Sequence, residues 1–113
     1  MIQLIKILQT VHQSAIIFND LKPDNIMVDR QTGKVTLIDF GFASTYLTAE
    51  GTHKSDAEMF DEFHGNILFA SFDQMNFFQT SRKDDMIALY YILLYTLNNH
   101  ELIGSKKDIS LLT

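Results

Sequence analysis

Apolar residues recur at helical spacing in the first part of the chain, and a longer apolar run follows near its other end. Apolar side chains between residues 2 and 14 fall close to a 3.6-residue period, with polar ones largely opposite. This pattern predicts an amphipathic helix that packs by one face. Residues 84–98 are apolar on nearly every side and predict a helix buried within the domain. The apolar positions of the first helix are Ile2, Leu4, Ile5, Ile7, Leu8 and Val11.

Short β-prone runs lie between these two helices. Residues 16–18 lead into a polar loop, and Pro23 keeps that loop from continuing as a helix. Residues 26–28 and 35–38 flank a polar stretch that ends near Gly33. They predict a β-hairpin in which Gly33 supplies the positive φ of the turn.

Four polar side chains lie next to these predicted strands. Antiparallel pairing would bring Asn25 and Asp39 to the same end of the hairpin, although fourteen positions separate them. Their oxygens suit Mg²⁺ as ligands. Asp20 can accept a hydroxyl proton, and Lys22 can neutralise a transferring phosphoryl group. The pattern predicts a phosphoryl-transfer site, with an ordinary turn or helix cap as the alternative interpretation.

The order of these residues resembles that of eukaryotic protein kinases, over nearly the whole chain. Asp20-Leu21-Lys22-Pro23-Asp24-Asn25 precedes Asp39-Phe40-Gly41. Gly65-Asn66-Ile67-Leu68-Phe69-Ala70-Ser71 and Ser81-Arg82-Lys83-Asp84-Asp85 are similar to stretches of the casein kinase I group, and no Ala-Pro-Glu occurs.

The resemblance implies an α+β fold, a mostly helical kinase-like C-terminal lobe with a short β-hairpin. The lobe would be incomplete as a kinase because no N-terminal lobe is present. Residues 1–113 would form a partial kinase domain with the catalytic loop, the Asp-Phe-Gly segment, the activation segment and the large apolar helix.

The resemblance also assigns roles to single residues. Asp20 matches the catalytic base, and Lys22 matches the lysine that contacts the γ-phosphate of ATP in Ser/Thr kinases. Asn25 and Asp39 match the two Mg²⁺ ligands. Asp85 matches a buried aspartate that accepts hydrogen bonds from the backbone of the catalytic loop. ATP and Mg²⁺ are therefore the expected cofactors, and a protein serine or threonine is the expected substrate.

Some positions depart from the family. Phe18-Asn19 replaces His-Arg before the base, so activation through a phosphate bound to that arginine is not expected. Leu68 replaces an arginine of the casein kinase I group, and a leucine cannot bind the phosphate of a primed substrate. The 113 residues contain no glycine-rich loop and no strand lysine, so we expect no activity from them alone. A non-catalytic pseudokinase fragment that binds proteins, and a small helical adaptor with a chance motif, remain alternatives.

The composition of the chain argues against several other classes of function. The chain is 46% hydrophobic and carries a net charge of −5, which provides no basic patch for nucleic acid or an anionic membrane. The absence of cysteine excludes disulfides and suits an intracellular location. The apolar run of residues 86–97 is shorter than the roughly 20 residues that cross a bilayer. The four histidines show no spacing typical of a metal site.

The middle of the chain is polar at first and then rich in phenylalanine. Residues 42–64 predict an irregular activation segment with a solvated acidic cluster. The aromatic run of residues 60–78 lacks interleaved basic residues and predicts packing onto the domain, not stacking on bases. Apolar faces left bare in an incomplete lobe predict self-association. The members of the acidic cluster are Asp56, Glu58, Asp61 and Glu62.

Overall fold

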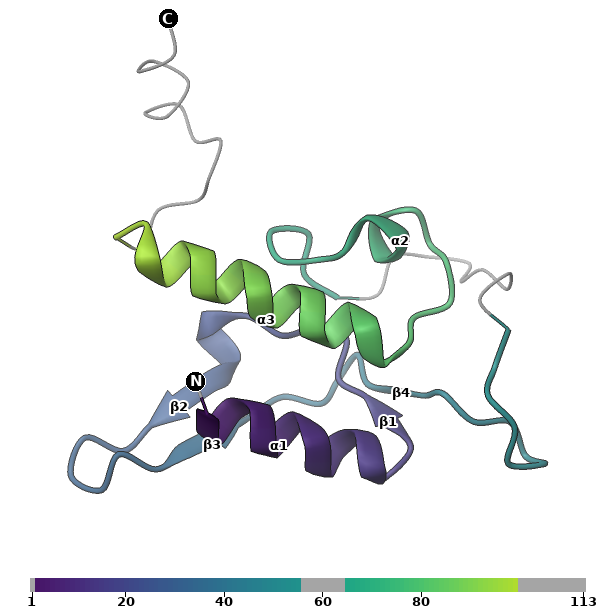
Figure 1. Ribbon diagram of the computed structural model, residues 1–113, viewed down its shortest axis with the longest axis horizontal. Coiled ribbons are helices and arrows are strands. Elements are labelled where there is room, and N and C mark those ends of the chain that lie inside the picture. Colours follow the sequence, from purple (N-terminus) through teal and green to yellow (C-terminus); the bar gives the residue numbers. More distant parts are fainter. Residues whose placement is uncertain (1, 56–64, 100–113) are drawn as a thin grey trace, which may run out of the picture.

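The computed structural model describes residues 2–55 and 65–99, and within them it contains three α-helices and two small antiparallel sheets. In Figure 1, α1 and α3 run in opposite directions, and the β2–β3 hairpin lies beside the start of α1. The elements are α1 (Ile2–Gln13), β1 (Ile16–Ile17), the 3₁₀ turn η1 (Pro23–Asn25), β2 (Ile26–Val28), β3 (Val35–Leu37), β4 (Ser44–Thr45), α2 (Phe72–Met75) and α3 (Arg82–Leu97).

The first helix forms as predicted. Leu4, Leu8 and Val11 are buried on one face of α1, and Leu8 is fully inaccessible to solvent. The helix ends at Gln13 because Ala15 adopts a φ of 65°, which cannot continue an α-helix. That turn leads directly into β1.

The predicted hairpin also forms. Ile26 pairs with Leu37, and Gly33 has a φ of 71° in the connecting turn. The Gly33 amide donates to the carbonyl oxygen of Asp29 at 2.7 Å, which closes the turn. Leu37 of β3 packs into the core, whereas Met27 of β2 lies on the other face of the hairpin and is exposed. The hairpin thus has one inner and one outer face.

The large helix begins at Arg82, two residues earlier than predicted. Ser81 has an extended backbone, and its amide donates to Asp84 Oδ2 at 2.8 Å. The Asp84 carboxylate therefore accepts a hydrogen bond from a backbone N–H group that has no partner within the helix. The Ser71 hydroxyl also donates to Asp84, so a buried carboxylate connects the start of α3 with the segment before α2.

Burial of α3 on all sides was predicted, and this prediction is wrong for the described residues. Ala88, Leu89 and Ile92 are buried, but Tyr90 is 56% and Leu97 72% exposed. The physical reason is that only one face of the helix joins the hydrophobic core. The core cluster comprises Leu4, Leu8, Phe18, Leu21, Leu37, Phe69, Ala88, Leu89 and Ile92.

The middle of the chain has more regular structure than predicted. Strand β4 pairs with β1, so residues 42–55 are not wholly irregular. The aromatic run divides: Phe69 packs in the core, whereas Phe72, at the start of the unpredicted helix α2, is 76% exposed. The acidic cluster Asp56, Glu58, Asp61 and Glu62 lies outside the described residues. No helix among residues 2–55 and 65–99 is long and apolar enough to cross a membrane.

A close contact joins the loop after β1 to the segment before α2. The buried Gln74 side chain donates from Nε2 to the carbonyl oxygen of Asn19 at 2.7 Å. Gly65 covers this hydrogen bond with a φ of +129°. A Cβ atom on Gly65 would lie 2.4 Å from the Asn19 oxygen and 2.3 Å from Gln74 Nε2. Only glycine allows the two segments to approach this closely.

We therefore expect Gly65→Ala to lower the free energy of unfolding by about 2–4 kcal/mol, because overpacking adds to backbone strain. Gly51→Ala is the matched control, since Gly51 also has a positive φ of +82° but no atom within 4 Å of the added Cβ. Strain alone should cost about 1 kcal/mol there. Urea denaturation followed by circular dichroism measures both. Equal losses in the two variants would contradict the contact described here.

Candidate active site

A buried carboxylate of α3 fixes the loop that follows β1. Asp85 is 1% exposed, and its Oδ1 and Oδ2 accept the backbone N–H groups of Asn19 at 2.9 Å and Phe18 at 2.8 Å. The role predicted for Asp85 is therefore confirmed. The His12 ring supplies a third partner, with Nε2 2.8 Å from Asp85 Oδ2. A buried carboxylate is stable only with such partners, so Asp85 sets the backbone immediately before Asp20.

His12 was not predicted to contact the site. It lies in the last turn of α1, next to Val11 on the buried face, and its backbone oxygen accepts the hydroxyl of Tyr46. A histidine on a buried helical face needs a polar partner. That requirement was visible in the sequence, but the partner, 73 positions away, was not.

Asn19 performs a structural role where kinases have an arginine. Its φ of 69° lies in the left-handed region, which asparagine tolerates better than most residues. Its Nδ2 donates to the Phe42 carbonyl oxygen and to Ser44 Oγ, both at 2.8 Å. Next to it, the Phe18 ring packs edge-on against Phe40 with centroids 4.9 Å apart. The loop is thereby joined to the segment after Asp39 by neutral contacts.

Asp20 has one satisfied oxygen and one free oxygen. The side chain is 2% exposed, and its Oδ2 accepts from Asn25 Nδ2 at 3.0 Å. Asn25 Nδ2 also donates to the Asp20 backbone oxygen at 2.8 Å. Asp20 Oδ1 is buried and accepts no hydrogen bond within the described structure, with Lys22 Nζ 3.9 Å away. The carboxylate is therefore oriented by Asn25, with an acceptor oxygen available.

The environment of Asp20 favours its protonated form. Burial raises the pKa of the Asp20 carboxyl, the hydrogen bond from Asn25 and the charge of Lys22 lower it by less, and the Asp39 carboxylate raises it further. The pKa consequently lies above its ordinary value of 3.8. A raised pKa next to a cation is a feature that functional sites share.

Asn25 and Asp39 lie at the same end of the hairpin, as predicted. The Asn25 carbonyl oxygen accepts the amide of Ile38 at 2.9 Å, which places Asp39 one residue beyond the pairing. Asp39 Oδ1 accepts the Gly41 amide at 3.1 Å. Both side-chain hydrogen bonds of Asn25 use Nδ2. Asn25 Oδ1 and Asp39 Oδ2 are therefore the atoms that a cation would contact.

These two oxygens are donors of the kind that hard cations such as Mg²⁺ accept. Among the residues that the structure describes, no group of three or more histidine, cysteine, aspartate or glutamate side chains is placed to hold a metal. Mg²⁺ is commonly bound through one or two protein oxygens, with water and substrate phosphates completing its shell. Asn25 and Asp39 match that donor set, so they suit Mg²⁺ that arrives with a nucleotide.

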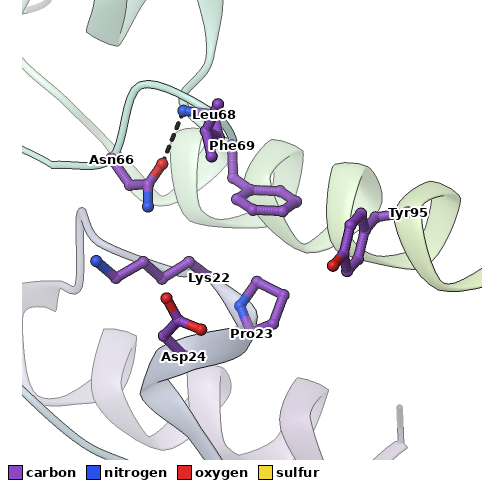
Figure 2. A pocket seen from close by; sticks show the side chains of 7 residues that line it. All are labelled: Lys22, Pro23, Asp24, Asn66, Leu68, Phe69 and Tyr95. Atoms are coloured by element: carbon purple, nitrogen blue, oxygen red, sulfur yellow. Dashed lines mark hydrogen bonds between the residues drawn. The ribbon is translucent and has the colours of Figure 1, made fainter. Parts of the chain in front are cut away.

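A pocket of about 330 Å³ opens beside Lys22. Figure 2 shows the side chains of Lys22, Asp24 and Asn66 at one end and the rings of Phe69 and Tyr95 toward the other. Sequence reasoning did not identify Asn66 or Tyr95 as lining residues. Asn66 lies within the stretch that resembles casein kinase I, which was a usable signal, but nothing in the sequence singled out Tyr95.

Asn66 also organises the wall of this pocket. Its Oδ1 accepts the Leu68 amide at 2.7 Å, so its side-chain oxygen is occupied and its NH₂ group is the remaining polar part. Leu68 itself is 58% exposed and contributes an apolar surface. The pocket therefore combines a polar end near Lys22 with apolar walls.

The sequence is similar to known proteins over most of its length. Residues 1–112 match the family model of the protein kinase domain. The chain is 28% identical over 103 residues to casein kinase I homolog 1 of Saccharomyces cerevisiae, covering 88% of this chain and 19% of that protein. It is 26% identical over 92 residues to a probable casein kinase I homolog of Encephalitozoon cuniculi, covering 81% of this chain and 28% of that protein. The chain thus spans less than a third of the length of either relative.

The raised pKa of Asp20 gives a pH-dependent prediction. Since folding raises this pKa, Asp20 stabilises the fold below 3.8 and loses that contribution as pH rises through the folded pKa. Asp20→Asn should therefore be more stable than the parent chain near pH 7, and the difference should shrink at about pH 3. Urea denaturation across this range measures it.

Asp29→Asn is the control with the opposite sign. Hydrogen bonds from the Gln31 and Thr32 amides lower the pKa of Asp29, so this carboxylate stabilises the fold at neutral pH and loses its effect as pH falls through the folded pKa. The Asn variant should be less stable near pH 7. If both variants respond to pH in the same direction, the environment assigned to Asp20 is wrong.

Proposed function

Because the chain belongs to the protein kinase domain family and is casein kinase I-like, we propose that it is the catalytic-loop part of a protein serine/threonine kinase. Residues 1–113 would form part of the C-terminal lobe. The observation that carries the proposal is Asp20, whose Oδ2 is fixed by Asn25 while its buried Oδ1 accepts no hydrogen bond within the described structure. A general base must be oriented and must have an acceptor atom within reach of the hydroxyl.

In this proposal Asp20 Oδ1 accepts the proton of the substrate hydroxyl as that oxygen attacks the γ-phosphorus. The bond from the γ-phosphorus to the leaving oxygen of the nucleotide breaks in the same displacement. ATP would supply the phosphoryl group, and a bound Mg²⁺ would neutralise part of the charge on the phosphates. Lys22 lies 3.9 Å from Asp20 and stabilises negative charge on the transferring group. Asn25 and Asp39 would hold the metal.

The outer face of the hairpin supports nucleotide binding. Alternation along the strands places Met27 and Ile38 on the face opposite Leu37, and they are 55% and 39% exposed. In the sequence, Ile38 directly precedes Asp39, and Met27 lies two positions after Asn25. A nucleotide whose phosphates contact Asn25 and Asp39 could therefore place its base against apolar surface, which ligand sites commonly provide.

The pocket in Figure 2 supports a protein substrate. Lys22 belongs to the catalytic loop and also lines this pocket. A substrate residue that flanks the acceptor hydroxyl would therefore enter the pocket. In this proposal Lys22 contacts the transferring phosphoryl group, and the other walls of the pocket, Leu68, Phe69 and Tyr95, offer no cation for a second phosphate. We therefore propose a neutral, apolar flanking residue in the substrate in place of a phosphorylated one.

A non-catalytic binding module is the second candidate. The 113 residues contain neither a glycine-rich loop nor a strand lysine for the phosphates of ATP. By themselves they should therefore have no kinase activity. The exposed face of α3, with Tyr90 and Leu97, gives such a module an apolar surface.

A chimera distinguishes these candidates. Residues 2–99 would replace the matching stretch of casein kinase I homolog 1 from Saccharomyces cerevisiae, which supplies the rest of the kinase. We expect the chimera to phosphorylate casein, and Asp20→Ala to lower kcat by about 10²–10⁴-fold because the base is lost. Asp29→Asn is the control, since Asp29 lies in the hairpin turn, and it should leave kcat unchanged. The isolated 113-residue chain, assayed in parallel, should be inactive.

The chimera also tests substrate choice. Leu68→Arg should restore preference for phosphate-primed peptides by about 1.5–3 kcal/mol, the usual value of a hydrogen bond to a charged group. Competition between primed and unprimed peptides measures that preference. A folded chimera that is inactive both with and without Leu68→Arg would exclude the intact site and favour the binding module.

Exposed apolar residues predict self-association of the 113-residue chain when it is expressed alone. Ile2, Phe72 and Leu97 are each more than 70% exposed, at 71%, 76% and 72%. Apolar surface of this kind promotes association. Sedimentation velocity at increasing protein concentration should show a rising mean mass. A monomer whose sedimentation does not change with concentration would contradict this prediction.

A further inference from the structure

A second pocket lies apart from the catalytic loop, between α1 and the first turns of α3. It has a volume of about 450 Å³ and shares no lining residue with the pocket beside Lys22. This volume lies within the range of roughly 300–1,000 Å³ that small-molecule sites occupy. The lining residues that matter here are Ile5, Gln9, His12, Tyr46, Arg82 and Met86.

The lining of this pocket includes a positive side chain in an acidic chain. No aspartate or glutamate lines it, Arg82 is its cation, and the His12 ring contacts the buried Asp85 behind it. Arg82 packs over the Tyr46 ring, with its guanidinium carbon 4.8 Å from the ring centroid, and within the described residues it forms no ion pair. The adjacent Lys83, by contrast, lies 2.8 Å from Asp73 and 3.3 Å from Asp84. Arg82 is thus positioned by a ring without being neutralised.

The inner wall of the pocket has an available ring nitrogen. His12 is 9% exposed, and its Nε2 contacts Asp85, so its orientation is fixed. Its Nδ1 forms no hydrogen bond within the part of the chain that the structure describes. Ile5 and Met86, which are 44% and 42% exposed, add apolar surface to the pocket.

We propose that this pocket binds a small organic anion, a phosphate monoester or carboxylate with an apolar body. The guanidinium of Arg82 presents a planar set of donors that suits either anionic group. The apolar body packs against Ile5 and Met86, beside the His12 ring that Asp85 holds in place. The site is separate from the phosphoryl-transfer residues, so the proposal does not depend on the chain being a kinase.

Titration of the full 113-residue chain with phenyl phosphate tests the proposal, followed by ¹H–¹⁵N NMR. Saturable shifts should concentrate at His12, Tyr46 and Arg82. Arg82→Gln should weaken binding on the order of tenfold or more, because a charge-assisted contact is lost. Neutral benzyl alcohol, which has a similar ring, should cause no saturable shift there.

Lys83→Gln is the matched control, because it removes the same formal charge from the next residue of α3, outside the pocket lining. It should change the affinity for phenyl phosphate by less than about twofold, in line with the small effect of exposed charges. Equal weakening in the two variants would show a general charge effect and overturn the proposal. The absence of saturable shifts at the pocket residues would overturn it as well.

Discussion

The buried carboxylate of Asp85 is the interaction on which the rest of this structure depends. It lies on α3, accepts backbone amides from the loop after β1, and contacts a histidine at the end of α1. Three segments that are distant in sequence therefore meet at one charge. Removal of any one donor would leave part of that charge unsatisfied in the interior, which costs far more than a surface contact. The relative placement of α1, the loop and α3 follows from this requirement.

The loop is constrained on both sides of the candidate base. Before Asp20, the backbone is held through Asp85 and through the side chain of Asn19. After it, Asn25 donates both to the Asp20 backbone and to its carboxylate. The result is a buried acid with a fixed orientation and one acceptor oxygen left over. Such an arrangement costs stability, and this cost is the physical basis for proposing a chemical role for Asp20.

Sequence periodicity predicted the elements that depend on local order. The amphipathic pattern located α1, and the β-prone runs around Gly33 located the hairpin and hence the approach of Asn25 to Asp39. The role of Asp85 came from a family resemblance, since nothing local indicates which amides it will accept.

The predictions missed or misjudged features that depend on contacts between residues distant in the sequence. Strand β4 consists of two residues that are extended because they pair with β1, and neither has a distinctive pattern. The exposed face of α3 also carries large apolar side chains, such as Met86, Tyr90 and Leu97, so hydrophobicity alone could not separate it from the buried face. The contact between His12 and Asp85 joins positions 73 residues apart, and Tyr95 reaches its pocket only through the packing of α3.

The side-chain amide of Asn19 has a consequence for how such a site could be controlled. In the described structure it binds the Phe42 carbonyl and the Ser44 hydroxyl without any charged group. In many kinases an arginine at this place binds a phosphate on the activation segment. Residue 19 is an asparagine, so its contacts with Phe42 and Ser44 do not depend on such a phosphate. The position of the loop before Asp20 therefore rests on uncharged hydrogen bonds and does not require a phosphate bound at position 19.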